Sequence, residues 1–533
     1  MNDRIAVLGL GCTGLACVKN LREQGLNAIG YDRNEYIGGI WQYTTNENVT
    51  CVLKTTTTNE PKYRFTFSDY EYPNELGHYS PAHDIVKYIQ GYAKKFDLLK
   101  HCRLGMAVQL LERSKDGQNW NITFKDKTGT VTRETFTRVV VCTGPQTQAI
   151  FPAHVEESRP IFKGRILHSQ AFKEPNDFAG KRVVVVGLSN TAGDIAVDLA
   201  KVCDQVYVAH RSGARVISRV KEGDGSPVDY KLTRRISYII ANISRWFPRL
   251  FPRFMEYYLE SNMASAFPQV LKHGEWRLLP APPIPNVTPM VNDYLIPLLQ
   301  DGKIESVHGV KRLLSGNALE LADGRVLDSI DAVIYCTGYE FDYSIFGREA
   351  DPTAFPTPEW DKQEHSRSLP YPRLYQGIFS TKYPESLAFI GPYRGYSFSH
   401  MANCDLASAA LSQIWKGNYM LPEKSEMERW CEAHYQKTLS EVSRWRIFGF
   451  TCDTGSLEKW LNDAAGNGIN EKLGWGMEGW SFWWNERKMY RMIMDGVDTV
   501  FLQRLFDGRG EKARKKWDGA RDAILRANAI INP

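Results

Sequence analysis

The sequence contains no long uninterrupted hydrophobic run. No apolar stretch reaches the roughly 20 residues that a helix needs to cross a bilayer. The N-terminus leads directly into RIAVLGLGCTG, and the C-terminus, RDAILRANAIINP, is short and polar. We therefore expect no signal peptide, no transmembrane segment and a cytoplasmic protein.

A large excess of charge of either sign is also missing. The formal net charge is +5 over 533 residues, so nothing in the charge indicates a nucleic-acid partner. The ten cysteines have neither the spacing of a disulfide framework nor that of a metal site. We expect a reducing compartment and no bound metal. Solenoid repeats and low-complexity tracts are absent, and the length predicts two or more domains.

A glycine-rich turn lies close to the N-terminus. Residues 4–8 have the composition of a buried parallel strand, GLGCTG follows at once, and LACVKNLREQG has a helical pattern. In such a turn Gly9 permits the tight bend, Gly11 lets the backbone approach a pyrophosphate, and Gly14 lets the helix pack closely on the strand. The turn residues expected to hold a dinucleotide are Gly9, Gly11, Cys12, Thr13 and Gly14.

The next predicted strand, NAIGYD, ends in an acid. A carboxylate at Asp32 can accept hydrogen bonds from both ribose hydroxyls, and it would repel a 2′-phosphate. This first site therefore favours FAD or NAD over NADP.

A second nucleotide signature begins at KRVVVVGLSNTAGDIAVDLA. Its four consecutive valines are typical of a strand buried on both faces. Gly187 keeps the first glycine of the fingerprint, whereas Ser189 and Ala192 replace the second and third. Small side chains still allow a pyrophosphate to approach, and the residues expected to contact it are Gly187, Ser189, Asn190 and Thr191.

The strand after this second turn ends in a base instead of an acid. QVYVAH is followed by Arg211, with Arg215 and Arg219 close behind. A guanidinium group at the ribose end can pair with a 2′-phosphate, which favours NADPH over NADH. Arg211 and Arg219 are the preferred candidates, and the sequence leaves open which arginine binds the phosphate.

Two further strands, RVVVCTG and DAVIYCTGY, end in similar TG turns. Such turns divide the chain where it crosses between two dinucleotide-binding domains. We expect a discontinuous first domain over 1–155 and 331–425, and a second domain over 156–330 inserted within it. A mostly helical C-terminal cover would follow over 426–533. The predicted fold is α/β with two Rossmann-like domains, one for FAD and one for NADPH.

With these parts in place, the sequence resembles the flavin-containing monooxygenases, which belong to the class B flavoprotein monooxygenases. The family signature FxGxxxHxxxY/F is matched, as are its GGxW stretch and its Thr-Asn segment reaching Ser-Asp. The residues that carry the resemblance are Phe162, Gly164, His168, Phe172, Gly38, Gly39, Trp41, Asn59 and Ser68. The resemblance runs nearly end to end.

The resemblance implies an NADPH- and O2-dependent enzyme that oxygenates a soft nucleophile, an amine nitrogen or a thioether sulfur, through a C4a-hydroperoxyflavin. Asn59 would lie near flavin N5 as the catalytic residue, and His168 would be a structural linker. Gly38, Gly39 and Trp41 would help to hold FAD. Asp405, near the start of a helix, would contact the flavin or cap that helix. Three aromatic residues, Tyr393, Tyr396 and Phe398, would line the substrate entrance or belong to the core.

Two alternatives remain open at this stage, and a third lacks the cysteine pair that it needs. A Baeyer–Villiger monooxygenase would act on a ketone, although Phe172 and Asn59 weigh against it. An uncoupled NADPH oxidase would release H2O2. A disulfide reductase would need a redox cysteine pair beside the flavin, and about 7.5 Å of helical rise between Cys12 and Cys17 is too long for an unstrained disulfide.

One segment, KLTRRISYIIANISRWFPRLFPR at 231–253, is rich in arginine and aromatic residues and contains no acid. It begins a basic aromatic insert at about 230–285. It could lie on an anionic membrane surface, or it could be a helical insert whose apolar face packs on its own protein. We also expect a homo-oligomer, a dimer.

Overall fold

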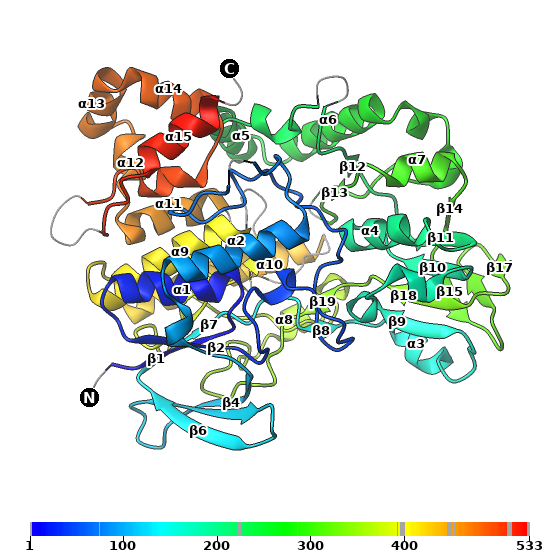
Figure 1. The fold of residues 1–533 in the computed structure, drawn as a ribbon, viewed down its shortest axis with the longest axis horizontal. Coiled ribbons are helices and arrows are strands. Elements are labelled where there is room, and N and C mark those ends of the chain that lie inside the picture. The colour runs from blue at the N-terminus through cyan, green and yellow to red at the C-terminus, as the bar shows by residue number, and fades with distance from the viewer. Residues whose placement is uncertain are drawn as a thin grey trace.

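The computed structural model describes most of the chain. The described residues are 3–73, 75–221, 225–284, 286–391, 393–394, 400–444, 450–451, 454–508 and 514–529. Within them the chain forms two parallel β-sheets of five strands each, with helices packed around them (Figure 1). The α/β class predicted from the sequence is confirmed.

The first sheet has the N-terminal strand at its centre. Its order is β20-β7-β1-β2-β3, and every pair is parallel. All four residues of β1 are buried, as expected for a strand covered on both faces. The elements of this layer are β1 (Ile5–Leu8), α1 (Cys12–Glu23), β2 (Ala28–Tyr31), α2 (Ala82–Lys95), β3 (Cys102–Arg103), β7 (Arg138–Val141), β20 (Leu387–Phe389) and α9 (His400–Lys416).

A three-stranded antiparallel sheet extends from the first domain at the lower left of Figure 1. Phe124 of its central strand stacks on Tyr31 at the end of β2, with ring centroids 4.5 Å apart. This contact buries the inner face of the small sheet against the large one. Its strands are β4 (Met106–Arg113), β5 (Trp120–Asp126) and β6 (Val131–Phe136).

The second sheet has the order β14-β11-β10-β18-β9 and is also parallel throughout. Its central strand contains the run of valines, and Val183, Val184 and Val185 are fully buried. Its elements are β9 (Arg165–His168), β10 (Arg182–Val186), α4 (Asn190–Leu199), β11 (Gln205–His210), α7 (Leu295–Gln300), β14 (Ile304–His308) and β18 (Ala332–Tyr335).

Smaller elements surround the second sheet. A short parallel pair and an antiparallel three-stranded sheet lie beside it, with one helix before β9. These elements are α3 (Ala153–Ser158), β12 (Val216–Ile217), β13 (Met290–Val291), β15 (Val310–Leu313), β16 (Leu319–Leu321) and β17 (Val326–Leu327).

The chain crosses between the sheets twice, and the two crossings lie side by side. β8 (Gln148–Ala149) pairs antiparallel with β19 (Tyr339–Glu340). The position at which we expect the first domain to resume, residue 331, falls just before β18, which is a strand of the second sheet. The similar TG turns after β7 and β18 arise because each turn leaves the end of an interior parallel strand next to the central one, one in each sheet.

Most of the remaining helices lie along the upper edge of the molecule in Figure 1, while α11 (Thr454–Ala465) lies lower and packs against α9. They include the basic insert and the C-terminal segment. The bounds of the others are α5 (Arg234–Trp246), α6 (Phe251–Ala266), α12 (Ile469–Lys472), α13 (Met477–Asn485), α14 (Arg487–Asp495) and α15 (Ala520–Ala529). Elsewhere lie α8 (Pro358–Asp361), α10 (Lys424–Val442), β21 (Tyr393–Arg394) and β22 (Phe450–Thr451). Among the described residues, no helix is both long and apolar enough to span a bilayer.

A buried arginine attaches the C-terminal segment to the first domain. The guanidinium of Arg504 donates to Asp69 at 2.5 Å and also to Asp507. Lys19 of α1 pairs with the same Asp69, and Glu23 lies 3.6 Å from the guanidinium. The opposite charges compensate one another in a site where the Arg504 side chain is only 1% exposed.

Candidate active site

The first glycine turn has no room for a side chain at two of its positions. Gly9 follows β1 with φ +96°, and a Cβ there would lie 2.5 Å from the Cys142 carbonyl oxygen. A Cβ on Gly14 would lie 1.7 Å from the Gly9 carbonyl oxygen. Both glycines are therefore required by the protein's own packing.

Gly11 is different because its Cβ position is open on the protein side. A Cβ there would meet Gly39 Cα at 3.6 Å, which is ordinary contact. Gly11 is the N-cap of α1, and within the described chain no side chain caps that end of the helix. The backbone N–H groups of the first turn, which includes Cys12 and Thr13, therefore remain available to an anion. A dinucleotide pyrophosphate fits this space and this charge.

Asp32 joins the turn to the end of β2. Its Oδ2 accepts from the Leu10 N–H at 2.7 Å and its Oδ1 from the Asn34 N–H at 2.8 Å. Burial raises the pKa of the Asp32 carboxyl, and the two backbone donors oppose that shift. Each oxygen keeps a second lone pair, so the carboxylate can brace the turn and still accept from a ribose hydroxyl.

The GGxW stretch lies directly beside this turn. Gly38 and Gly39 have φ values of +108° and +56°, and the Gly38 N–H donates to the Leu10 carbonyl at 2.9 Å. The Trp41 ring packs on Phe65 with centroids 5.1 Å apart. The structure therefore brings all the residues predicted to hold FAD, except Asp405, to one end of the first sheet.

The second turn repeats this plan with side chains in place of two glycines. Gly187 has φ +128°, and a Cβ there would lie 2.8 Å from the Cys336 carbonyl oxygen. Ser189 is the N-cap of α4, and its exposed side chain makes no capping hydrogen bond. Thr191 is exposed in the first turn, whereas the Asn190 side chain accepts from the Val291 N–H at 2.8 Å.

The packing role of Gly193, at the end of this turn, was not predicted from the sequence. A Cβ on Gly193 would lie 2.8 Å from Met290 Sδ and 3.2 Å from Asn292 Nδ2. Gly193, one position after Ala192, therefore lets α4 pack against β13. The dinucleotide fingerprint has its third glycine at the position of Ala192, so a glycine one position later does not match it.

The three candidate arginines have different surroundings. Arg211 is exposed immediately after β11. Arg215 is buried, and its guanidinium donates to the Pro282 carbonyl at 2.5 Å and to Glu260 at 2.6 Å. Arg219 instead reaches the first domain and donates to Asn59 Oδ1 at 2.8 Å. Of the three, Arg211 has the guanidinium most accessible to a 2′-phosphate.

The Thr-Asn segment lies between the two domains. Asn59 is exposed, and its side-chain oxygen accepts from Arg219 of the second domain. Asp405 lies apart from it, inside α9, where Oδ1 accepts from Asn20 at 2.9 Å and Oδ2 from the Ser68 N–H at 2.8 Å. The alternative in which Asp405 caps its helix is wrong, because the residue is within the helix and holds α1 and the Ser68 loop together.

Comparison with known proteins agrees with this geometry. The family model described as flavin-binding monooxygenase-like matches residues 2–531. The chain belongs to this family. It is 38% identical to monooxygenase aurF of Gibberella zeae over 532 residues, which cover 99% of the chain and 98% of that protein. It is 30% identical to flavin-containing monooxygenase 5 of Homo sapiens over 533 residues, covering 98% and 91%.

The solved structures give the same fold. The S-allyl-L-cysteine S-oxygenase from Allium sativum matches with a TM-score of 0.59 at 20% identity, covering 99% of this chain and 98% of the other. The resemblance drawn from the motifs is confirmed, and with it the prediction of a flavin-dependent monooxygenase.

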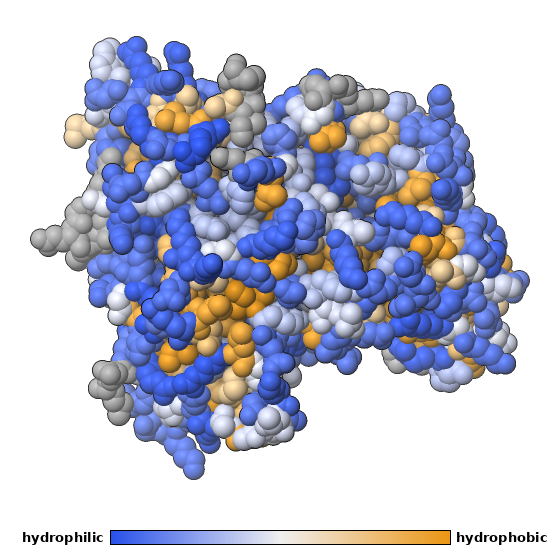
Figure 2. Space-filling model, viewed as in Figure 1, coloured by the Kyte–Doolittle hydropathy of each residue, from blue (hydrophilic) through white to orange (hydrophobic). Residues whose placement is uncertain are grey.

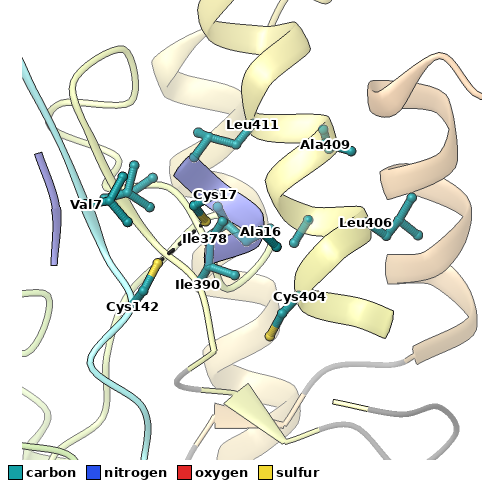
Figure 3. Packing of buried hydrophobic residues seen from close by; sticks show 14 of the residues in the cluster. Val7, Ala16, Cys17, Cys142, Ile378, Ile390, Cys404, Leu406, Ala409 and Leu411 are labelled. Atoms are coloured by element: carbon teal, nitrogen blue, oxygen red, sulfur yellow. Dashed lines mark hydrogen bonds between the residues drawn. The ribbon is translucent and has the colours of Figure 1, made fainter. Parts of the chain in front are cut away.

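The thiols of Cys12, Cys17 and Cys142 in this flavin monooxygenase are packing groups. Cys17 of α1 lies with its Sγ 3.5 Å from Cys142 Sγ, inside the buried cluster of Figure 3. Burial raises the pKa of the Cys17 thiol well above its ordinary value and that of Cys12 to about 12. Thiols held protonated in this way are poor nucleophiles. The sequence suggested only the Cys12 and Cys17 pair, because Cys142 is distant in the chain.

The signature histidine of the monooxygenase lies at the crossing between the sheets. His168 ends β9, and its ring packs edge-on against Phe151 and Tyr339, with centroids 5.5 and 4.9 Å away. Its Nδ1 accepts from the Gln170 N–H at 3.2 Å. Burial lowers the pKa of His168 to about 4, so the ring is neutral at pH 7 and serves as a structural link.

We predict an acid-sensitive stability from the two buried histidines, His168 and His210. Burial lowers the pKa of each to about 4, against an ordinary value of 6.5. The folded state favours the neutral rings, so this stability is present above pH 6.5 and is lost as the pH falls toward 4. Each ring should cost about 2 kcal/mol at pH 5. Urea unfolding at pH 7 and pH 5 measures this, and His168→Gln should lose less stability than the wild type between these values.

Of the three aromatic residues predicted at the substrate entrance, one lies among the described residues. Tyr393 lies in β21, whose backbone pairs with β22. Tyr396 and Phe398 lie outside the described residues.

Proposed function

We propose that the enzyme uses FAD, NADPH and O2 to oxygenate a soft nucleophile, an amine nitrogen or a thioether sulfur. The observation that supports this proposal is the hydrogen bond from Arg219 to Asn59 Oδ1, by which the Thr-Asn segment contacts the domain that we propose to bind NADPH. When bound, the flavin supplies the oxygen-activating chemistry. The chain supplies orientation, hydrogen bonds and shielding from water.

Each part of the chain has a distinct task in this proposal. The first turn and Asp32 hold FAD by its pyrophosphate and ribose. The second turn holds the pyrophosphate of NADPH, and Arg211 holds its 2′-phosphate. Asn59 offers a neutral amide, which can donate a hydrogen bond without releasing a proton.

Product analysis tests the proposal. The FAD-loaded enzyme is supplied with NADPH and O2, and with an amine, a thioether or a ketone in separate reactions. Oxygenated amine or thioether with little H2O2 is the expected result. Lactone or ester formation from the ketone alone would favour the Baeyer–Villiger alternative, and H2O2 in every reaction would favour an NADPH oxidase.

Arg211→Ala should change the choice of nucleotide. Loss of a charged hydrogen bond to the 2′-phosphate should raise the KM for NADPH by about 10- to 100-fold, or about 1–3 kcal/mol. The KM for NADH should stay unchanged because NADH lacks that phosphate. Steady-state kinetics with both nucleotides measures the difference, and Arg312→Ala, an exposed arginine of the same domain, is the control. An equal loss for both nucleotides would place the 2′-phosphate elsewhere.

The insert helices present an apolar and basic surface that suits an anionic bilayer. Trp246, Phe254 and Tyr257 are 69%, 64% and 73% exposed. Arg245, Arg249 and Arg253, which lie close to these rings in the chain, are also exposed. A groove of about 3130 Å³ separates this insert from α13, which adds the exposed residues Trp480 and Trp484 along the same upper edge of Figure 1. Rings interleaved with arginines are typical of interfacial helices.

On the face shown in Figure 2, hydrophilic residues cover most of the periphery, and the largest gathering of hydrophobic residues lies over the first domain. The partner part of the proposal rests on the exposed rings and arginines of the insert: it is reversible contact of α5 and α6 with an anionic membrane. A cytoplasmic enzyme would meet such a surface on a cytosolic leaflet. A homodimer remains a prediction.

Co-sedimentation tests the membrane contact. Vesicles of equal parts phosphatidylcholine and phosphatidylserine should bind the enzyme at low salt and release it as salt rises. Replacing both Trp246 and Phe254 with alanine should weaken binding by at least about tenfold, because two large apolar side chains no longer enter the bilayer. Val131→Ser, at an exposed site on β6, should have no effect. Equal binding of the wild type and the double variant would refute the contact.

A further inference from the structure

Arg219 connects the second domain to the segment that carries Asn59. Its Nε donates to the Thr58 carbonyl at 3.1 Å, and one terminal nitrogen donates to Asn59 Oδ1 at 2.8 Å. The other terminal nitrogen donates to Asp293 at 2.7 Å. The side chain is only 10% exposed. All three nitrogens of the guanidinium therefore have protein partners.

These contacts fix the direction of the Asn59 amide. A guanidinium has donors only, so it must face the oxygen of the amide and not its NH2 group. A reversed amide would place donor against donor. The Nδ2 donor of Asn59 is thereby directed away from Arg219.

Arg219 is itself held from both sides. Asp293 Oδ1 accepts from the Arg219 backbone N–H at 2.9 Å and from the Ser218 hydroxyl at 2.8 Å. The Tyr79 hydroxyl of the first domain donates to the Arg219 carbonyl at 2.8 Å. Charge-assisted bonds of this kind are the stronger class of hydrogen bond. A fixed guanidinium gives the amide a fixed partner.

We propose that Arg219 is a positioning residue for the oxygenation reaction, which orients the Asn59 amide and makes that orientation depend on the docking of the second domain. The proposal rests on the proposed function of Asn59. It assigns the Arg219 guanidinium to Asn59, Thr58 and Asp293, and leaves the 2′-phosphate to Arg211.

Arg219→Lys separates the two roles. A lysine keeps the positive charge beside Asp293, but one ammonium group cannot donate to Thr58, Asn59 and Asp293 in the planar geometry of the guanidinium. With the FAD-loaded enzyme, the fraction of NADPH electrons appearing as H2O2 should rise several-fold, while the KM for NADPH stays within about twofold. Arg312→Lys should change neither. A KM that rises for NADPH and not for NADH would assign Arg219 to the 2′-phosphate and overturn the proposal.

A double-mutant comparison tests whether Arg219 acts through Asn59. Asn59→Ala combined with Arg219→Lys should be no more uncoupled than Asn59→Ala alone. Additive uncoupling would mean that Arg219 acts independently of Asn59, contrary to the proposal. If Asn59→Ala alone leaves coupling intact, the proposed function of Asn59 is wrong. Hydrogen exchange then tests separately whether Arg219 holds the Asn59 segment.

Hydrogen exchange of the FAD-free protein gives a readout independent of activity. Backbone amides at 57–60 should exchange at least about tenfold faster in Arg219→Lys than in the wild type, because the side chain no longer holds the loop. If Arg219→Lys does not fold, Asp293→Asn replaces it, because this change removes the carboxylate that pairs with the Arg219 guanidinium. Unchanged exchange in a folded variant would overturn the proposal.

Discussion

Gly11→Ala is expected to weaken FAD binding by about 10- to 100-fold while leaving the stability of the FAD-free protein unchanged. On the protein side a Cβ at Gly11 meets only Gly39, at ordinary contact distance. On the open side it would enter the space of the pyrophosphate, and overfilling such a contact costs about 1–3 kcal/mol. Fluorescence titration with FAD and urea unfolding of the FAD-free protein measure the two quantities.

Gly14→Ala is the matched comparison. Its Cβ would overlap the Gly9 carbonyl oxygen at 1.7 Å, so the FAD-free protein itself should be destabilised. If Gly11→Ala bound FAD as tightly as the wild type, the pyrophosphate would not lie against this turn.

Asn59→Ala should retain bound FAD and should still oxidise NADPH, yet form roughly 100-fold less oxygenated product. The alanine removes the amide donor, while the glycine turn and Asp32, which we propose to hold FAD, are elsewhere in the first domain. Measuring NADPH consumed, product formed and H2O2 released in one reaction gives the coupling directly.

Asn59→Asp is a useful control for this result. A carboxylate would still accept from Arg219, but it lacks the NH2 donor. It should therefore lose product as the alanine variant does while keeping the contact between the domains. Coupling equal to that of the wild type in both variants would remove Asn59 from the reaction.

The two glycine turns could be predicted because their requirements are local. Gly9 and Gly187 need positive φ within a few residues of a buried strand, and this leaves a pattern in the sequence. The surroundings of the basic side chains could not be predicted in the same way. Arg215 pairs with Glu260 and Arg219 reaches Asn59, which lies 160 residues away in the chain.

The contacts of Asp405 and the sheet to which β18 belongs could not be predicted from the local sequence either. Position near a predicted helix start suggested capping, but the partners of Asp405 come from α1 and the Ser68 loop. The hydrophobic strand β18 has the same pattern in either sheet, and only its pairing with β10 and β9 assigns it to the second. Residues far away in the chain determine both the role of Asp405 and the position of β18.

The order of strands in the first sheet has a consequence for synthesis on the ribosome. β20 pairs with β7, yet its residues, Leu387–Phe389, are made only after the whole second domain. At about 5–20 residues per second, the edge of β7 waits roughly 10–50 s for its partner. During that time the nascent first domain exposes an unpaired strand edge, so we expect ribosome-bound chains that end before β20 to depend on chaperones, and chains that extend past it to resist aggregation.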